Sequence, residues 1–313
     1  MDTLRSVSQT AEVSPQMLPL TYPGERPSGS VLVTRDAEYP IEAHGDVISK
    51  WHTVGPDFSG ELNVVLSKMG STPVEDRIPV LAFGSNACPA QLRHKAEQSG
   101  FRLDIPLLKV VVAGVTVGHS ATLSSRGYFP MTGVPRSSSI ARGHLMLLDE
   151  HQLMAMDRSE PGFQRVLLSS RDGYALECGG VRLATTYMYV AREGHLVDKD
   201  SGSTLYDTDH EALLSRLVSS PGDLRALLGD DPEEIVARAR RSTSGTLHTV
   251  VDALHAAGWV ERWDPANLLE CHKDRRPMYF GAQESPTRVL WHTESDMADR
   301  EQNSVSVSPI LLW

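Results

Sequence analysis

The alternation of apolar and polar positions is densest between Ile78 and Arg192, where it predicts a strand-rich domain. Only two short helices, at residues 89–98 and 150–159, fit a helical period in this region. Many strands with few helices predict an α+β domain with a mostly antiparallel sheet core, open or closed into a β-barrel, rather than a doubly wound fold. The expected strands are residues 80–83, 107–117, 141–148, 164–168 and 183–190.

The second of these helices has clear end signals in the sequence. Asp149 is a suitable N-cap residue, and Gln152, three positions later, completes a capping box. Pro161 and Gly162 should stop the helix. We therefore expect Glu160 at the C-terminal edge of the helix, directly before a break in the chain.

The pattern is weaker on both sides of this core. Residues 1–30 are rich in Ser, Pro, Thr and Gly and are predicted to form a poorly ordered arm. Strand-like pieces follow at residues 31–34 and 62–66, either as an added hairpin or as a wrap around the main domain. After Gly194, helical periodicity returns at residues 209–218, 223–228 and 232–257. The predicted organisation is an N-terminal arm and appendage (1–77), a core (78–194), a helical extension (195–262) and an irregular C-terminal tail (263–313).

Composition and charge narrow the class of protein. The chain has 313 residues, 40% hydrophobic and 22% charged, as in soluble globular proteins. A formal net charge of -10 without a basic block disfavours nucleic acid as a partner. Three cysteines without a CxxC pair fit a reducing cytoplasm, and the longest apolar window, residues 110–117, is too short to span a bilayer. We expect a cytoplasmic protein without nucleic-acid or membrane partners, for which homo-oligomers stay open.

Metal and cofactor motifs are incomplete in this sequence. His210 and Glu211 begin like an HExxH zinc helix, but Leu214 stands where the second histidine would be. Cys271 and His272 lack partners at zinc-finger spacing. We therefore expect no metal and no cofactor.

The stretch PVLAFGSNACPAQL, residues 79–92, is the first candidate for chemistry. An apolar run enters the turn Gly84, Ser85 and Asn86, and Pro89 then starts a helix. Backbone N–H groups of such a turn, together with the positive end of the helix, can bind an anion or an oxyanion. The same shape also serves as a purely structural connection, and neither a Walker lysine nor a GxGxxG spacing accompanies it.

Glu160 is the second candidate. A carboxylate at a helix end, close to the apolar Leu153 and Met156, suits proton transfer at neutral pH. The alternative interpretation is a solvated residue at the end of a helix.

Taken together, the two motifs resemble the γ-glutamylcyclotransferase-like family. The sequence FGSN follows a strand and precedes a helix, and the block GHLMLLDEHQLMAMDRSEPG is followed by a strand beginning FQR. The resemblance covers about residues 78–192 and aligns Gly84, Ser85 and Asn86 with the substrate-holding loop and Glu160 with the catalytic glutamate of the family. Phe83 replaces the usual tyrosine of the loop, and Pro161 is inserted after the glutamate.

This resemblance implies a reaction by intramolecular aminolysis. Glu160 would act as general acid and base on a γ-glutamyl amide or a related N-acyl amine, which would release 5-oxoproline and a free amine. The loop from Phe83 to Asn86 would hold substrate oxygens. No metal is required for this chemistry, and the large extension after Gly194 favours a specialised small-molecule amide or an oligomer interface.

Other residues are weaker candidates. Within the polar segment 118–133, Arg126 could pair with a substrate carboxylate and Tyr128 could supply the hydroxyl that Phe83 lacks. Two alternatives to the enzyme stay open. One is a non-catalytic small-molecule-binding module of the same fold, and the other is an amide hydrolase or acyltransferase that depends on Cys88 at a helix start, activated by His119 or His144.

Overall fold

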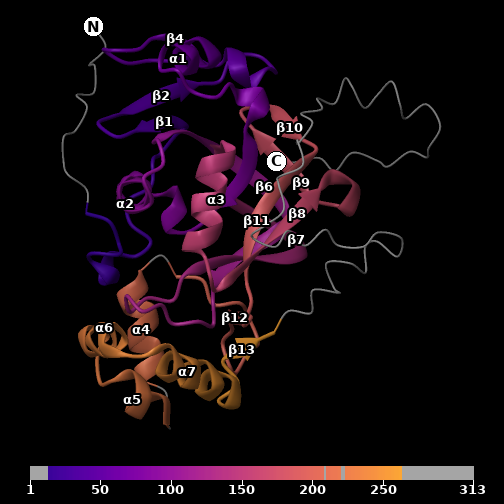
Figure 1. Ribbon diagram of the computed structural model, residues 1–313. Helices are drawn as coiled ribbons and strands as arrows, with labels where there is room; N and C mark the ends of the chain where they lie inside the picture. Colours follow the sequence, from indigo (N-terminus) through magenta and orange to yellow (C-terminus); the bar gives the residue numbers. More distant parts are fainter. Residues whose placement is uncertain (1–12, 208, 220–222, 263–313) are drawn as a thin grey trace, which may run out of the picture.

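A large mixed sheet forms the centre of the computed structural model, which describes residues 13–207, 209–219 and 223–262 (Figure 1). The sheet has eleven strands, and its main path runs in the order β4-β3-β2-β1-β6-β7-β5-β11-β8, with β9 paired to β6 and β10 to β9. The strands are β1 (Val31–Thr34), β2 (Glu38–Glu42), β3 (His52–Thr53), β4 (Gly60–Glu61), β5 (Ile78–Ala82), β6 (Asp104–His119), β7 (Met131–Leu148), β8 (Phe163–Ser169), β9 (Ala175–Cys178), β10 (Val181–Leu183) and β11 (Thr185–Ala191).

The strand pairing is antiparallel except between β5 and β11, which confirms the prediction of an α+β fold with a mostly antiparallel sheet. Within the described residues, no pairing joins the two ends of the path, so the hydrogen-bonded order is that of an open sheet. The centre is the hairpin of β6 and β7, which a register shift interrupts between Ala113 and Val115. Gly114 lies at this shift with a φ of +87°, a conformation that glycine adopts without strain.

Strand β5 is buried along its whole length because both faces of the sheet are covered there. Val80 and Ala82 point to a core that Leu92 of α2 (Pro89–Ser99) and Met156 of α3 (Glu150–Ser159) complete. Leu81 points to the opposite core. A continuous apolar run is the sequence pattern of a strand buried on both faces, and burial of each large side chain contributes about 1.5–3 kcal/mol.

The boundaries of α2 and α3 follow the local signals in the sequence. Pro89 occupies the first turn of α2, and Gly100 ends it in the left-handed conformation with a φ of 70°. The predicted capping box of α3 is present, with Gln152 N–H donating to Asp149 at 2.8 Å and Asp149 N–H donating to Gln152 at 2.9 Å. The helix ends at Ser159, and Glu160 is its C-cap as expected.

The N-terminal region differs from its prediction in two ways. Residues 62–66 were expected to be strand-like, but they belong to helix α1 (Leu62–Lys68), because Leu62, Val65 and Leu66 share one buried face at helical spacing. The expectation of a poorly ordered arm is wrong for residues 13–30, which pack against the core and the helical extension, whereas residues 1–12 lie outside the described part. Strands β1 to β4 extend the main sheet, so the appendage is continuous with the core.

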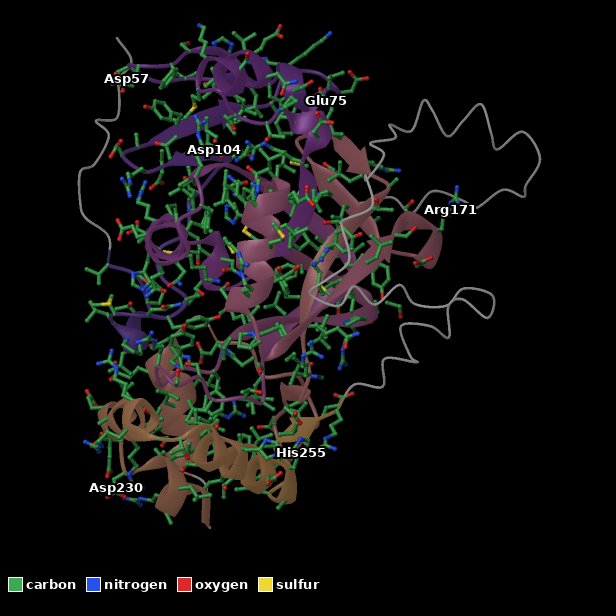
Figure 2. All side chains as sticks on the ribbon, in the orientation of Figure 1. Asp57, Glu75, Asp104, Arg171, Asp230 and His255 are labelled. Atoms are coloured by element: carbon green, nitrogen blue, oxygen red, sulfur yellow. The ribbon has the colours of Figure 1, made fainter. Side chains whose placement is uncertain are left out.

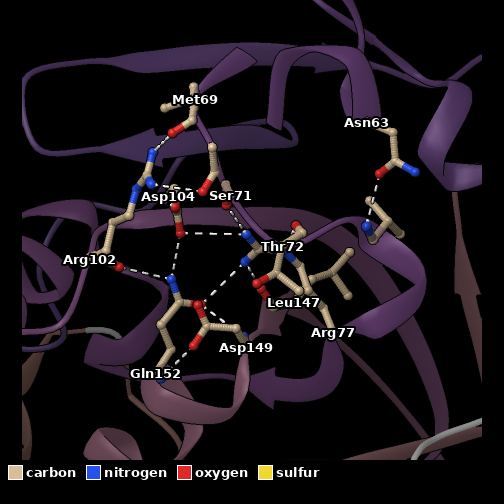
Figure 3. Close-up of polar contacts among 12 residues, drawn as sticks. Asn63, Met69, Ser71, Thr72, Arg77, Arg102, Asp104, Leu147, Asp149 and Gln152 are labelled. Atoms are coloured by element: carbon tan, nitrogen blue, oxygen red, sulfur yellow. Dashed lines mark hydrogen bonds and ion pairs between the residues drawn. The ribbon is translucent and has the colours of Figure 1, made fainter. Parts of the chain in front are cut away.

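A buried polar network ties the starts of β5, β6 and α3 together (Figure 3). Arg77 donates to the carbonyl oxygens of Thr72 and Leu147, both at 2.9 Å, and lies 3.5 Å from Asp104. Gln152 Nε2 donates to the same carboxylate at 2.6 Å. Burial lowers the pKa of Arg77, while Asp104 opposes that shift. This network fixes the start of α3 and therefore the direction in which its C-terminal end points.

Four helices after the sheet form the expected helical extension at one end of the molecule (Figure 1). They pack around their own apolar core, which also takes in Phe129 from the loop between β6 and β7. The segment 232–257, expected as one helix, is two, because Ser242 turns the chain and Thr243 caps a new start. The elements are α4 (His210–Val218), α5 (Asp223–Leu228), α6 (Pro232–Arg241) and α7 (Ser244–Ala256), with β12 (His195–Leu196) paired to β13 (Val260–Glu261).

Figure 2 shows the two ends of the molecule, with Asp57 and Glu75 on the appendage and Asp230 and His255 on the helical extension. None of the described helices is long and apolar enough to cross a bilayer. The predicted C-terminal tail, residues 263–313, lies outside the described residues.

Candidate functional site

The loop after β5 turns sharply and presents the side chain of Asn86 to the interior. Gly84 precedes a short 3-10 helix, Ser85–Ala87, and the Ala87 N–H donates to the Gly84 carbonyl oxygen at 3.0 Å. Helix α2 follows at Pro89. The loop therefore lies at the carboxyl end of β5, fixed between this strand and the start of α2.

Glu160 meets this loop directly. Helices α2 and α3 complete the same core on one face of the sheet, and this brings the end of α3 next to the turn. Asn86 Nδ2 donates to Glu160 Oε1 at 3.0 Å. Gly84, Ser85, Asn86 and Glu160 line one cavity of about 40 Å³. The structure therefore brings together the two motifs that were expected to form one site.

Lys95 is a third member of the site, and sequence reasoning missed it. Its ammonium group lies 2.6 Å from Glu160 Oε1, 2.6 Å from Asn86 Oδ1 and 2.9 Å from the Ser159 hydroxyl. The side chain is only 5% exposed, and that of Glu160 is 16% exposed. A signal was present, because Lys95 and Ala96 follow the apolar Leu92 by three and four positions, the spacing of one helical face, and this places a cation on the buried face of α2.

Asp157, one turn before Glu160, is neutralised by its own partners. Arg165 forms a bidentate pair with its carboxylate at 2.9 and 3.0 Å, and the Tyr189 hydroxyl donates to it at 2.7 Å. Tyr189 also lines the cavity. Burial, followed by the charge of Asp157, raises the pKa of Tyr189 well above its ordinary value. Within the part of the chain that the structure describes, the ion pair of Glu160 is the one with Lys95.

Tyr22 reaches the cavity from the N-terminal arm. Its hydroxyl oxygen accepts a hydrogen bond from the backbone N–H of Met131 at 2.6 Å. Its ring stacks on Tyr128 with ring centres 4.4 Å apart. Burial raises the pKa of Tyr22, so the phenol is neutral. Sequence reasoning missed this residue because the arm carries no helical or strand periodicity.

The remaining candidate residues differ in whether they reach the cavity. Phe83 lines the cavity, and its ring packs against Gly143. Tyr128 is buried behind Tyr22 and does not line the cavity. Arg126 is exposed on the loop between β6 and β7 and also lies outside the cavity lining. Pro161 is exposed in the turn between α3 and β8, where Phe163 N–H donates to the Glu160 carbonyl oxygen at 3.0 Å.

The structure gives no support to the alternative in which the enzyme depends on Cys88. Cys88 is buried at the N-cap of α2. Nδ1 of His119 lies 2.9 Å from the Phe129 carbonyl oxygen, and Nε2 lies 2.9 Å from the Asp207 carbonyl oxygen. His144 Nε2 lies 3.1 Å from the Pro27 carbonyl oxygen, and burial lowers the pKa of His144 to about 4. These contacts engage both histidines with the backbone.

A larger hollow of about 740 Å³ lies on the appendage, away from Glu160. It is lined by β2, α2 and the segment around Asp57, and its charged side chains include Arg93 and Glu38, which pair with each other at 2.9 Å. Among the residues that the structure describes, no cluster of three or more His, Cys, Asp or Glu side chains could hold a metal ion.

Comparison with known proteins leaves the family of this chain open. No family model and no curated protein matches the sequence. Among solved structures, the solution structure of At3g28950.1 from Arabidopsis thaliana is similar over 36% of this chain, with 17% identity and a TM-score of 0.27. The match spans 61% of the length of that protein.

Proposed function

We propose that this chain is a γ-glutamylcyclotransferase-like enzyme that cleaves a γ-glutamyl amide, or a related N-acyl amine, by intramolecular aminolysis. The observation that carries the proposal is the shared cavity, in which the Glu160 carboxylate lies 3.0 Å from the side chain of Asn86 in the loop. A proton-handling group and backbone N–H donors thus face one space. General acid–base catalysis and an oxygen receptor both require this arrangement.

The reaction needs few groups from the protein. Glu160 takes a proton from the α-ammonium of the substrate, and the freed amine attacks the γ-carbonyl carbon of the same molecule. As the amide C–N bond breaks, Glu160 returns this proton to the leaving nitrogen, and the second proton that the attacking nitrogen loses passes to the same amine, which yields 5-oxoproline and the free amine in protonated form. Because nucleophile and carbonyl share one molecule, correct orientation alone is worth about 7–11 kcal/mol.

The contacts of Glu160 suit this role. Among the described residues, the hydrogen bonds to its side chain come from Lys95 and Asn86, and both fall on Oε1. Oε2 is left for the substrate proton, while the pair of donors fixes the orientation of the carboxylate. Lys95 and Asn86 are therefore positioning residues for the proposed base.

A non-catalytic small-molecule-binding module is the second candidate. The observation in its favour is the same contact set, since Glu160 Oε1 already holds both an ammonium and an amide donor. In such a module the cavity would bind a γ-glutamyl compound without turnover.

The replacement Glu160→Gln tests the proposal, because it keeps the shape of the side chain and removes the base. The assay follows 5-oxoproline by mass spectrometry for a panel of γ-glutamyl amines. Loss of a positioned base predicts a fall in turnover of about 10²- to 10⁴-fold. Because Glu160→Gln also leaves the buried Lys95 ammonium without its carboxylate, turnover is measured at a temperature at which circular dichroism shows the variant to be folded. Glu150→Gln, at an exposed position of the same helix, is the matched control. Full activity of Glu160→Gln would exclude the mechanism, and binding without product in the unmodified protein would favour the module.

A further inference from the structure

The candidate site has little free volume in this structure. Its cavity of about 40 Å³ has room for little more than a water molecule, whereas pockets for small molecules have volumes of about 300–1,000 Å³. Most of the lining belongs to the sheet, to the loop after β5 and to the end of α3, which are held by backbone ladders and caps. Two lining residues come from outside these elements: Pro130, which directly precedes β7, and Tyr22 from the N-terminal arm.

The Tyr22 hydroxyl occupies the position that a substrate oxygen would take. Tyr22 and Ser85, a residue of the receptor loop, line the same small cavity. The Tyr22 hydroxyl is also so close to Gly84 that a methyl group on that residue would collide with the phenol oxygen. A substrate oxygen bound by this loop and the Tyr22 hydroxyl therefore compete for the same space.

The segment that carries Tyr22 is anchored by separate hydrogen bonds and not by strand pairing. Arg26 donates to the Phe83 carbonyl oxygen at 2.9 Å, and Ser14 donates to Gln91 at 2.6 Å. From the helical extension, Arg240 donates to the Met17 carbonyl oxygen at 2.9 Å. In Figure 1 the indigo arm accordingly lies between α2 and the helices of the extension. Segments held by side-chain contacts open at lower free energy than paired strands.

We propose that residues 13–27 form an intramolecular plug, in which Tyr22 closes the receptor and must withdraw before a substrate enters. The proposal rests on the proposed function for the identity of the receptor. Tyr128 stacks on Tyr22, and the ring of His210 from α4 meets Tyr22 edge-on with centres 5.4 Å apart. The helical extension thus helps to hold the plug in place, which gives this added region a regulatory role at the site.

A disulfide that can be formed and reduced between the arm and α2, called the lock below, tests the plug within a single protein. A cysteine at Gly24 would place its Cβ 2.7 Å from the sulfur of Cys88, within reach of a disulfide that ties the arm to the start of α2. The variant Gly24→Cys is studied oxidised and reduced, so both states share one sequence. Gly24 has a φ of +83°, and the resulting strain is present in both states.

The first readout needs no ligand. Amide hydrogen exchange at Ser85 and Asn86 should be at least about tenfold slower in the oxidised than in the reduced protein, because opening exposes these N–H groups. In Gly24→Cys combined with Tyr22→Ala, oxidation should change the exchange of these amides little, since the plug is gone. The control combines Gly24→Cys with Tyr206→Ala, a replacement at an exposed tyrosine. Equal exchange at Ser85 in the two redox states of Gly24→Cys would overturn the plug.

The second readout uses 5-oxoproline as the probe and follows the same amide signals in a titration. Reduction, or Tyr22→Ala, should tighten binding at least about tenfold relative to the locked protein. If exchange responds to the lock but no variant binds 5-oxoproline or forms it from γ-glutamyl amines, the plug stands and the proposed function fails. If 5-oxoproline binds equally to the locked and unlocked protein, the plug is refuted and the receptor stands.

Discussion

Loss of Lys95 from its ion pair with Glu160 is expected to destabilise the protein and to free the carboxylate from its position. The ammonium has three acceptors within 2.9 Å, and it is almost fully buried. At 2.6 Å and an effective dielectric constant of about 20, the gross Coulomb attraction is about 6 kcal/mol. Desolvation of both groups offsets much of this attraction, so the net value of the pair is far smaller.

The replacement Lys95→Met keeps the length of the side chain and removes the charge. Removal of one partner from a buried pair costs about 3–5 kcal/mol, and the partial exposure of Glu160 places the expected loss near about 3 kcal/mol. For a domain of this size, that corresponds to a fall in Tm of about 6–12 °C. The double variant Lys95→Met with Glu160→Gln should be more stable than Lys95→Met alone, because no carboxylate is then left without its cation.

Urea unfolding of the four proteins in this double-mutant cycle measures the coupling free energy. We expect about 1.5–3 kcal/mol, as for hydrogen bonds to charged groups. Lys68→Met, at an exposed position of α1, is the matched control. Additive effects within about 0.5 kcal/mol, or a Lys95→Met variant as stable as the unmodified protein, would refute the reasoning.

Two further predictions concern the docking of the helical extension and the buried histidines. Gly127 has a φ of +100°, and a methyl group there would lie 2.6 Å from Val236 Cα in α6, so Gly127→Ala should lower the free energy of unfolding by about 2–3 kcal/mol. Gly45→Ala, at a φ of +66° with open space around it, should cost only about 1 kcal/mol, and an equal loss at both sites would contradict the predicted clash. Because the pKa of His144 falls from 6.5 to about 4 on folding, the unfolded chain binds the extra proton between these values, and stability is lost as the pH drops from 6.5 to 4. His144→Gln should reduce the slope of unfolding free energy against pH in this range by about 1.4 kcal/mol per pH unit, with His151→Gln as control; an unchanged slope would show that His144 is not responsible.

Local signals predicted the elements that frame the site. The capping box at Asp149 and Gln152 located α3 to the residue, and the apolar run of β5 marked a strand buried on both faces. The same reasoning failed at residues 62–66, where a short apolar run fits a strand as well as the helix that forms. A run of five residues is too short to distinguish the helical period from the strand period.

The sequence by itself determined the strand-rich core, the helical extension and the position of Glu160 at the end of α3, because each depends on spacing within a few residues. Only the tertiary structure decided what Glu160 contacts. Lys95 is 65 residues from it along the chain, and the Tyr22 hydroxyl binds the N–H of Met131, 109 residues away. Such contacts depend on how α2, α3 and the arm pack over the sheet, and no local periodicity encodes that packing.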